Sequence, residues 1–185
     1  MLAYVFWHWR RPQVSAAAYE ALQRRFHSAL AAAPPLGFQR SCSLAIAGAP
    51  WAAGGSEAYE DWYLVEDSGA LDALNAAAVS ASRQVPHDDA AAAAGGGTAG
   101  LYRIRLGSAG GLPRSAIWFS KPTGMSYGEL FTALEPVVQA ERAALWGRQM
   151  TLGPALEFCL HAPRPVSLPA PLVPTSLRCR PVWPQ

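Results

Sequence analysis

The same order of sequence patterns occurs twice along the chain. An aromatic stretch with the composition of a strand, Ala3–Pro12, precedes a long amphipathic run, and a second such stretch, Ser115–Pro122, precedes another. Each copy later contains an alternating Arg-x-Arg segment, at residues 101–106 and 176–181. A duplicated β-α-β-β unit of this kind constrains the architecture strongly. It constrains function weakly, because one fold can host many activities.

The first copy has the pattern of four strands and two helices. Alternation over 38–46 is typical of a strand, whereas the spacing of Tyr19 and Phe26 is typical of a helix that Ser15 caps. The predicted order is strand, helix, strand, strand, helix, strand, at residues 2–9, 15–33, 38–46, 59–65, 68–82 and 101–106. The glycines of QVPHDDAAAAAGGG (84–97) argue against a continuous helix, so a long irregular connection is expected there.

The second copy is shorter. Ser126 and Glu129 form a capping box, and the helix that follows is predicted to run to Trp146. Where a second helix would come, the chain reads APRPVSLPAPLVPT, and so many prolines exclude a regular helix. The strands of this copy after the helix are expected at residues 150–152, 156–161 and 176–182.

These patterns predict an α+β protein of two tandem ferredoxin-like β-α-β-β-α-β units, residues 1–110 and 111–185, with the second unit degenerate. Their antiparallel sheets are expected to form an α+β barrel. In its element order the chain resembles the fused form of the dimeric α+β barrel superfamily. The resemblance implies two facing sheets with helices outside, and a small molecule bound between a sheet and its helices or inside the barrel. The superfamily includes cofactor-free monooxygenases, isomerase-like proteins and haem-binding members, so it assigns no residue a role.

Composition excludes several classes of protein. A formal net charge of +2 with scattered basic residues gives no footprint for nucleic acid. No apolar run reaches the roughly 20 residues that a membrane span needs, so no membrane partner is expected. Three widely separated cysteines, Cys42, Cys159 and Cys179, favour reduced thiols and a cytoplasmic location. The four histidines lack the short spacings of a metal site, and no cofactor is expected.

Two histidines are candidates for acid–base catalysis. His8 lies among aromatic residues on the first predicted strand, where it would be either a tuned general base or a packed core histidine. His87 lies in the expected connection, where Asp88 would either orient its ring or serve as a turn residue. Of the other two histidines, His27 is expected at a helix surface and His161 at a solvated strand end.

Aromatic and arginine side chains are candidates for substrate binding. Arg103 and Arg105 alternate along one strand face, where they would bind an anion or form cross-strand ion pairs with Glu60 and Asp61. The aromatic side chains would line a hydrophobic pocket or simply fill the core. The candidate substrate-binding residues are Trp7, Trp62, Tyr102, Arg103 and Arg105.

The leading functional hypothesis is a protein that binds or transforms a small hydrophobic or aromatic molecule in a cleft of the barrel. Whether it is an enzyme stays open, because the sequence contains no P-loop, dinucleotide fingerprint or nucleophile elbow. The alternative is a non-catalytic binding or assembly module whose sheets pair with another subunit, for example in a homodimer. A further alternative is a haem protein, in which one histidine would be the axial ligand.

Overall fold

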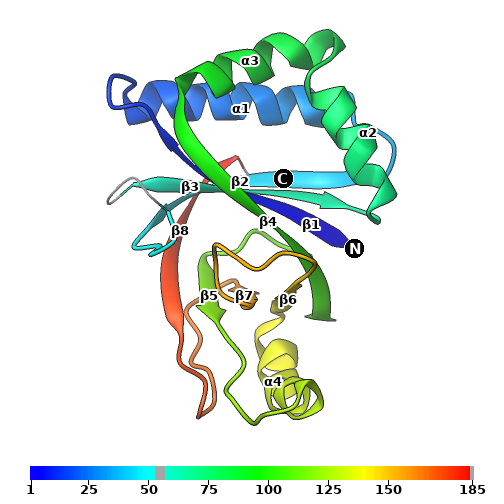
Figure 1. The fold of residues 1–185 in the computed structure, drawn as a ribbon, viewed down its shortest axis with the longest axis vertical. Helices are drawn as coiled ribbons and strands as arrows, with labels where there is room; N and C mark the ends of the chain where they lie inside the picture. Colours follow the sequence, from blue (N-terminus) through cyan, green and yellow to red (C-terminus); the bar gives the residue numbers. More distant parts are fainter. Residues whose placement is uncertain (53–56, 184–185) are drawn as a thin grey trace.

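The alternating segments of both copies pair into a single antiparallel sheet that closes on itself, with the helices outside (Figure 1). The computed structural model describes residues 1–52 and 57–183. The strands are β1 Leu2–Arg10, β2 Phe38–Ala47, β3 Ala58–Val65, β4 Ala94–Gly107, β5 Ser115–Phe119, β6 Ala144–Arg148, β7 Phe158–Ala162 and β8 Thr175–Trp183. The helices are α1 Ala16–Ala32, α2 Gly69–Ala78, α3 Gln84–Ala93 and α4 Tyr127–Glu141, with a 3-10 turn at Ala81–Arg83. The predicted α+β barrel is therefore confirmed.

The barrel order is β1-β3-β2-β8-β5-β7-β6-β4. The first four strands lie in the order β4-β1-β3-β2, and the last four in the corresponding order β8-β5-β7-β6. The pairs β2–β8 and β4–β6 join the halves, so the eight described strands leave no free edge. No described helix is both long and apolar enough to cross a membrane.

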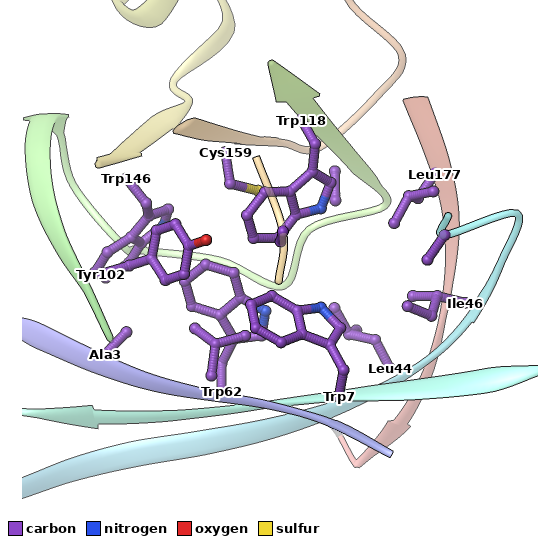
Figure 2. Close-up of a cluster of buried hydrophobic side chains, with 14 of the residues drawn as sticks. Ala3, Trp7, Leu44, Ile46, Trp62, Tyr102, Trp118, Trp146, Cys159 and Leu177 are labelled. Atoms are coloured by element: carbon purple, nitrogen blue, oxygen red, sulfur yellow. The ribbon is translucent and has the colours of Figure 1, made fainter. Parts of the chain in front are cut away.

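Strand alternation gives the barrel an inner and an outer face. On β1, Ala3, Val5 and Trp7 belong to the inner core, whereas Leu2 packs in the cluster beneath α1 and α2, and His8 contacts Tyr19 of α1. The interior is filled by side chains that point toward one another (Figure 2). Its largest members, each almost fully buried, are Trp7, Trp62, Trp118, Trp146 and Tyr102. The middle of the barrel is thus a packed aromatic core, where each such side chain stabilises the fold by a few kcal/mol, of order 2 to 3.

The expectation of an irregular connection over 84–97 is wrong. Residues Gln84–Ala93 form α3, in which Pro86 stands in the first turn, where its missing N–H does no harm. β4 then begins at Ala94 and runs through the glycines, because β1 supplies the ladder partners for their backbone groups. The Trp9 ring lies so close to Gly96 that a Cβ atom there would come within 2.6 Å of it.

In the second half, α4 ends five residues earlier than predicted, at Glu141. Arg142 adopts a left-handed conformation (φ 50°) that terminates the helix, and the strand expected at 150–152 is instead β6 at Ala144–Arg148. β6 forms because Leu145 packs outward beneath α4 while Trp146 enters the core, which is strand alternation. No helix forms between β7 and β8, as the prolines predicted.

Candidate functional site

The candidate site is a cleft of about 870 Å³ between the outer face of β1, β3 and β4 and the helices α1, α2 and α3. These three helices lie together on one side of the sheet (Figure 1). The apolar part of the lining includes Tyr4, Phe6, Phe26, Leu71, Leu74 and Leu101. The polar part includes Tyr19, Gln23, Asp61, Tyr63 and His87. A cavity of this size and mixed lining is typical of small-molecule sites.

The cleft stays open because small residues form its β4 wall and much of its α3 wall. Gly95, Gly96 and Gly97 line it from β4, and Ala90 and Ala91 line it from α3. A Cβ atom on Gly97 would come within 2.4 Å of the Phe6 ring. A larger residue on this strand would therefore displace an aromatic side chain of the lining.

A buried acid stands at the polar end of the cleft. Asp61 is 1% exposed, and its Oδ2 atom lies 3.2 Å from the Nε2 atoms of both His8 and His27. Neither contact has the geometry of a hydrogen bond, and each is an ion pair when the imidazole is protonated. The Tyr63 hydroxyl donates a hydrogen bond of 3.1 Å to the same oxygen.

Two hydroxyl groups hold the other sides of the imidazole rings. The Tyr19 hydroxyl lies 2.7 Å from Nδ1 of His8, and the Ser41 hydroxyl lies 2.7 Å from Nδ1 of His27. The His8 ring stacks between Phe6 and Tyr59, and the His27 ring stacks on Tyr63. Packing and hydrogen bonds together fix both rings, as a preorganised site requires.

The protonation states follow from burial and from these neighbours. Burial alone would raise the pKa of Asp61, but the positive charges of His8 and His27 outweigh it and lower that pKa. Burial, reinforced by the charge of Asp61, raises the pKa of Tyr63 and of Tyr19. At neutral pH the site therefore holds a carboxylate beside two protonated phenols.

The other carboxylate oxygen of Asp61 has no partner among the described residues. Oδ1 is buried and makes no hydrogen bond. Leaving one buried acceptor of a charged group unpaired costs roughly 1 to 3 kcal/mol or more. Asp61 is one of the residues that line the cleft, so a donor bound there could satisfy this buried oxygen if the side chains that cover it shift.

Glu60, the neighbour of Asp61 on β3, faces the opposite way, into the barrel. Its two oxygens accept hydrogen bonds from the indole N–H groups of Trp7 (2.7 Å) and Trp62 (2.6 Å). The expected ion pairs of Glu60 and Asp61 with Arg103 and Arg105 are therefore not formed. Each acid is enclosed on its own face of β3.

The predicted site residues fall into separate places. His8 belongs to the Asp61 network behind Tyr19, and His87 lines the cleft from α3, where its side chain is 34% exposed and lies 3.0 Å from Asp88. Trp7 and Tyr102 are core residues. The expectation that His87 lies in a connection is wrong, as shown above.

The remaining candidates also lie away from the cleft. Trp62 lines a second cavity at one end of the barrel. Arg103 donates a hydrogen bond of 2.7 Å to Gln149, and Arg105 borders a small cavity beside Tyr127 on the other side of the molecule. None of these three residues lines the cleft.

The second histidine of the network, His27, was not predicted from the sequence. His27 was expected at a helix surface but is fully buried against Asp61, and His161, expected to be solvated, has a side chain only 11% exposed. A signal for His27 exists, since Tyr19, Gln23 and His27 follow one another at intervals of four and so share a helix face. Asp61 gives no such signal, because only the barrel brings β3 beneath α1.

Among the described residues, no group of three or more His, Cys, Asp or Glu is arranged to hold a metal ion. No family model and no curated protein sequence matches the chain. Among solved structures, the chain is similar to one titled as a crystal structure study of an anthrone oxidase-like protein. The TM-score is 0.48 and the sequence identity 7%, over 98% of this chain and 93% of that one.

Proposed function

We propose that this protein binds a small, mainly aromatic molecule carrying one hydrogen-bond donor, in the cleft between β1, β3, β4 and helices α1–α3. The observation that carries the proposal is Asp61, a buried carboxylate that lines the cleft and has one oxygen without a hydrogen-bond partner among the described residues. The rest of the lining supports an aromatic body for the ligand, because Tyr4, Phe6 and Phe26 present rings to the same space.

Asp61 is better suited to holding a ligand than to removing a proton from it. A general base works best when its pKa lies near the working pH, and the pKa of Asp61 is lowered by its two histidines. A carboxylate that stays ionised accepts a strong hydrogen bond and orients the donor of the ligand. The site thereby favours binding and orientation of a phenol, amine or amide group.

A second candidate function is acid–base turnover of the bound molecule. It is favoured by the hydrogen bond between Tyr19, which lines the cleft, and His8 behind it. This contact would let His8 exchange a proton with a ligand through the Tyr19 hydroxyl. If the protein is found to turn over a bound molecule, the His8→Asn variant should lower kcat for that reaction. The His87→Asn variant tests the other predicted base. Full activity in both variants would show that neither histidine is the base.

The test begins with native mass spectrometry of the freshly purified protein, which reports any molecule that stays bound. The protein is then titrated by calorimetry with 1-naphthol, which has one donor, and with 1-methoxynaphthalene, which has none. A charge-assisted hydrogen bond to Asp61 should make 1-naphthol bind about 10- to 100-fold more tightly. Equal affinity for the two compounds would contradict the role of Asp61.

A matched pair of variants places the ligand in the cleft. Ala91 and Ala92 are both exposed on α3, but only Ala91 lines the cleft. Ala91→Trp should fill part of the space and weaken 1-naphthol binding by about tenfold or more, whereas Ala92→Trp should leave that binding unchanged.

The same measurements test the two alternative functions. A haem-sized mass increment in native mass spectrometry would favour the haem alternative. A bare oligomer that binds neither compound would favour the assembly alternative, which would have to use helices or loops because the barrel has no free edge.

The architecture supports a duplication as the origin of the barrel. We infer that residues 1–110 and 111–185 are tandem ferredoxin-like units of the fused dimeric α+β barrel type. The support for this inference is the corresponding strand order of the two halves.

We also propose a cytoplasmic location, because the three cysteines are free thiols. Burial raises the pKa of the Cys42 thiol to about 12, so this thiol is unreactive.

A further inference from the structure

We propose that the end of the barrel holds a second ligand site, independent of the cleft, for a small planar aromatic anion such as an arenecarboxylate. A cavity of about 470 Å³ lies there beneath the loop that joins β4 to β5. Its walls come from opposite sides of the barrel: β2 and β3 on one side, β6 and the end of β7 on the other. It shares no lining residue with the cleft.

The rim of this cavity is positively charged. Arg40 of β2 and Arg142, which follows α4, both line it, and none of the described lining residues is Asp or Glu. The ion pairs of the described residues use other arginines: Arg10, Arg24, Arg25, Arg164 and Arg180. Arg40 and Arg142 have no carboxylate partner among the described residues, so each could bind a ligand carboxylate, because the paired N–H groups of a guanidinium match its two oxygens.

The floor of the cavity is aromatic and apolar. Trp62 and Trp146 lie there, together with Leu64 and Ala144. The ring of His161 lies 4.3 Å from that of Trp62. Its buried Nε2 atom lies 3.9 Å from Glu60 and has no hydrogen-bond partner within residues 1–52 and 57–183. The rings of Trp62 and Trp146 contact each other, with centroids 5.2 Å apart. An aromatic ring would lie against these indoles from the cavity side, and its carboxylate would then point toward the arginines.

The covering loop is attached to the same arginine. The side chain of Arg40 donates a hydrogen bond to the backbone oxygen of Ala109, and Ala109 and Leu112 pack against the barrel core. The loop contains Gly110 and Gly111, at which an added Cβ atom would have almost no neighbours. The loop is thus held over the cavity by one side-chain hydrogen bond and two apolar residues, so a small movement of the loop would admit a ligand.

The test is a titration of the whole protein with benzoate and with benzamide, which has the same shape but no charge. Calorimetry gives the affinity, and tryptophan fluorescence reports the approach of the ligand to Trp62 and Trp146. Benzoate should bind at least about tenfold more tightly than benzamide, and added salt should weaken the binding of benzoate alone. Equal binding of both, or binding of neither at millimolar concentration, would overturn the proposal.

Variants identify the residues. Arg142→Asn removes the charge at an exposed position whose left-handed backbone suits asparagine, so the fold should be kept. This variant should weaken the binding of benzoate about tenfold, and Arg40→Gln should weaken it by the same factor. Arg114→Gln, which removes an exposed charge near the same loop but outside the cavity, should change nothing. Saturating 1-naphthol should not displace benzoate; competition would assign both compounds to the cleft and overturn the proposal.

Discussion

The two halves of the barrel have corresponding strand orders but cover their outer faces differently. Over the second half, Leu130, Leu134 and Val138 of α4 pack directly on the sheet, and the cavity beside them is only about 220 Å³. Over the first half, α1, α2 and α3 stand around a cleft of about 870 Å³. Figure 1 shows the two helical layers at opposite ends of the molecule.

The side chains of the sheet account for this difference. The outer face of the second half is made of large apolar residues, Ile117, Phe119, Leu145, Phe158 and Leu160, which fill the space beneath α4. The outer face of the first half also carries large side chains, such as Tyr4 and Phe6, but it has glycines on β4 and a polar group that contains His8 and Asp61. One barrel therefore supports a packed half and an open half, and the larger of the two proposed binding sites lies over the open half.

The largest expected effect comes from the polar group of the open half. Asp61→Asn leaves His8, His27 and Tyr63 buried without their carboxylate, so the free energy of unfolding should fall by about 3 to 5 kcal/mol. Urea unfolding measures this change. Asp89→Asn, which breaks the exposed pair with Arg25, is the control and should cost less than about 1 kcal/mol. Equal costs for the two variants would show that the buried network contributes no special stability.

Leucine truncations compare the two helical layers directly. Leu134 of α4 is fully buried, and Leu134→Ala should lower the free energy of unfolding by about 3 to 4 kcal/mol, because it opens a cavity in a packed layer. Leu74 of α2 lines the cleft, so Leu74→Ala enlarges an existing space and should cost only about 1 to 2 kcal/mol. The same urea experiment measures both. A larger loss for Leu74 would mean that the open half is packed as tightly as the other.

Acid should weaken the open half in a way that depends on Asp61. The pKa of Asp61 is lower in the folded protein than its ordinary value of 3.8, so the unfolded chain takes up the proton first. The contribution of Asp61 is complete above about pH 5 and declines as the pH falls below about 4, toward the folded pKa. Unfolding between pH 7 and pH 2 should show a steeper loss for the wild type than for Asp61→Asn. If the stability of the two proteins fell equally with pH, Asp61 would not be the cause of the acid sensitivity.

More of the fold than of the candidate site could be predicted from the sequence. Element order alone predicts the barrel and the missing second helix, because the strand alternation of 38–46 and the prolines of 163–174 are local signals. The glycines of β4 misled the prediction, since a strand with so little intrinsic preference forms only because β1 pairs with it. Tertiary pairing, which no local pattern contains, decided that element.

The site depends on contacts between distant segments. His8 was recognised as a candidate, but it meets Asp61, and Asp61 meets His27, only because β1, β3 and α1 come together. The same reasoning about strand faces could have separated Glu60 from Asp61, since neighbours on a strand point to opposite faces. What the sequence does not contain is which face of β3 lies inside the barrel, and that decides which acid meets the histidines.

The smallest effects are expected from glycine substitutions in the two halves. Gly97→Ala places a methyl group against the Phe6 ring, which must move within the cleft lining, so stability should fall by about 1 kcal/mol and 1-naphthol binding should weaken. Gly128 lies in α4 with only a Ser126 hydroxyl near the added atom, at 3.9 Å, so Gly128→Ala should stabilise by about 0.5 kcal/mol and leave binding unchanged. Calorimetry and urea unfolding measure both properties. If Gly97→Ala left binding intact, the β4 glycines would not be what keeps the cleft open, and the contrast between the halves would have to rest on the polar residues alone.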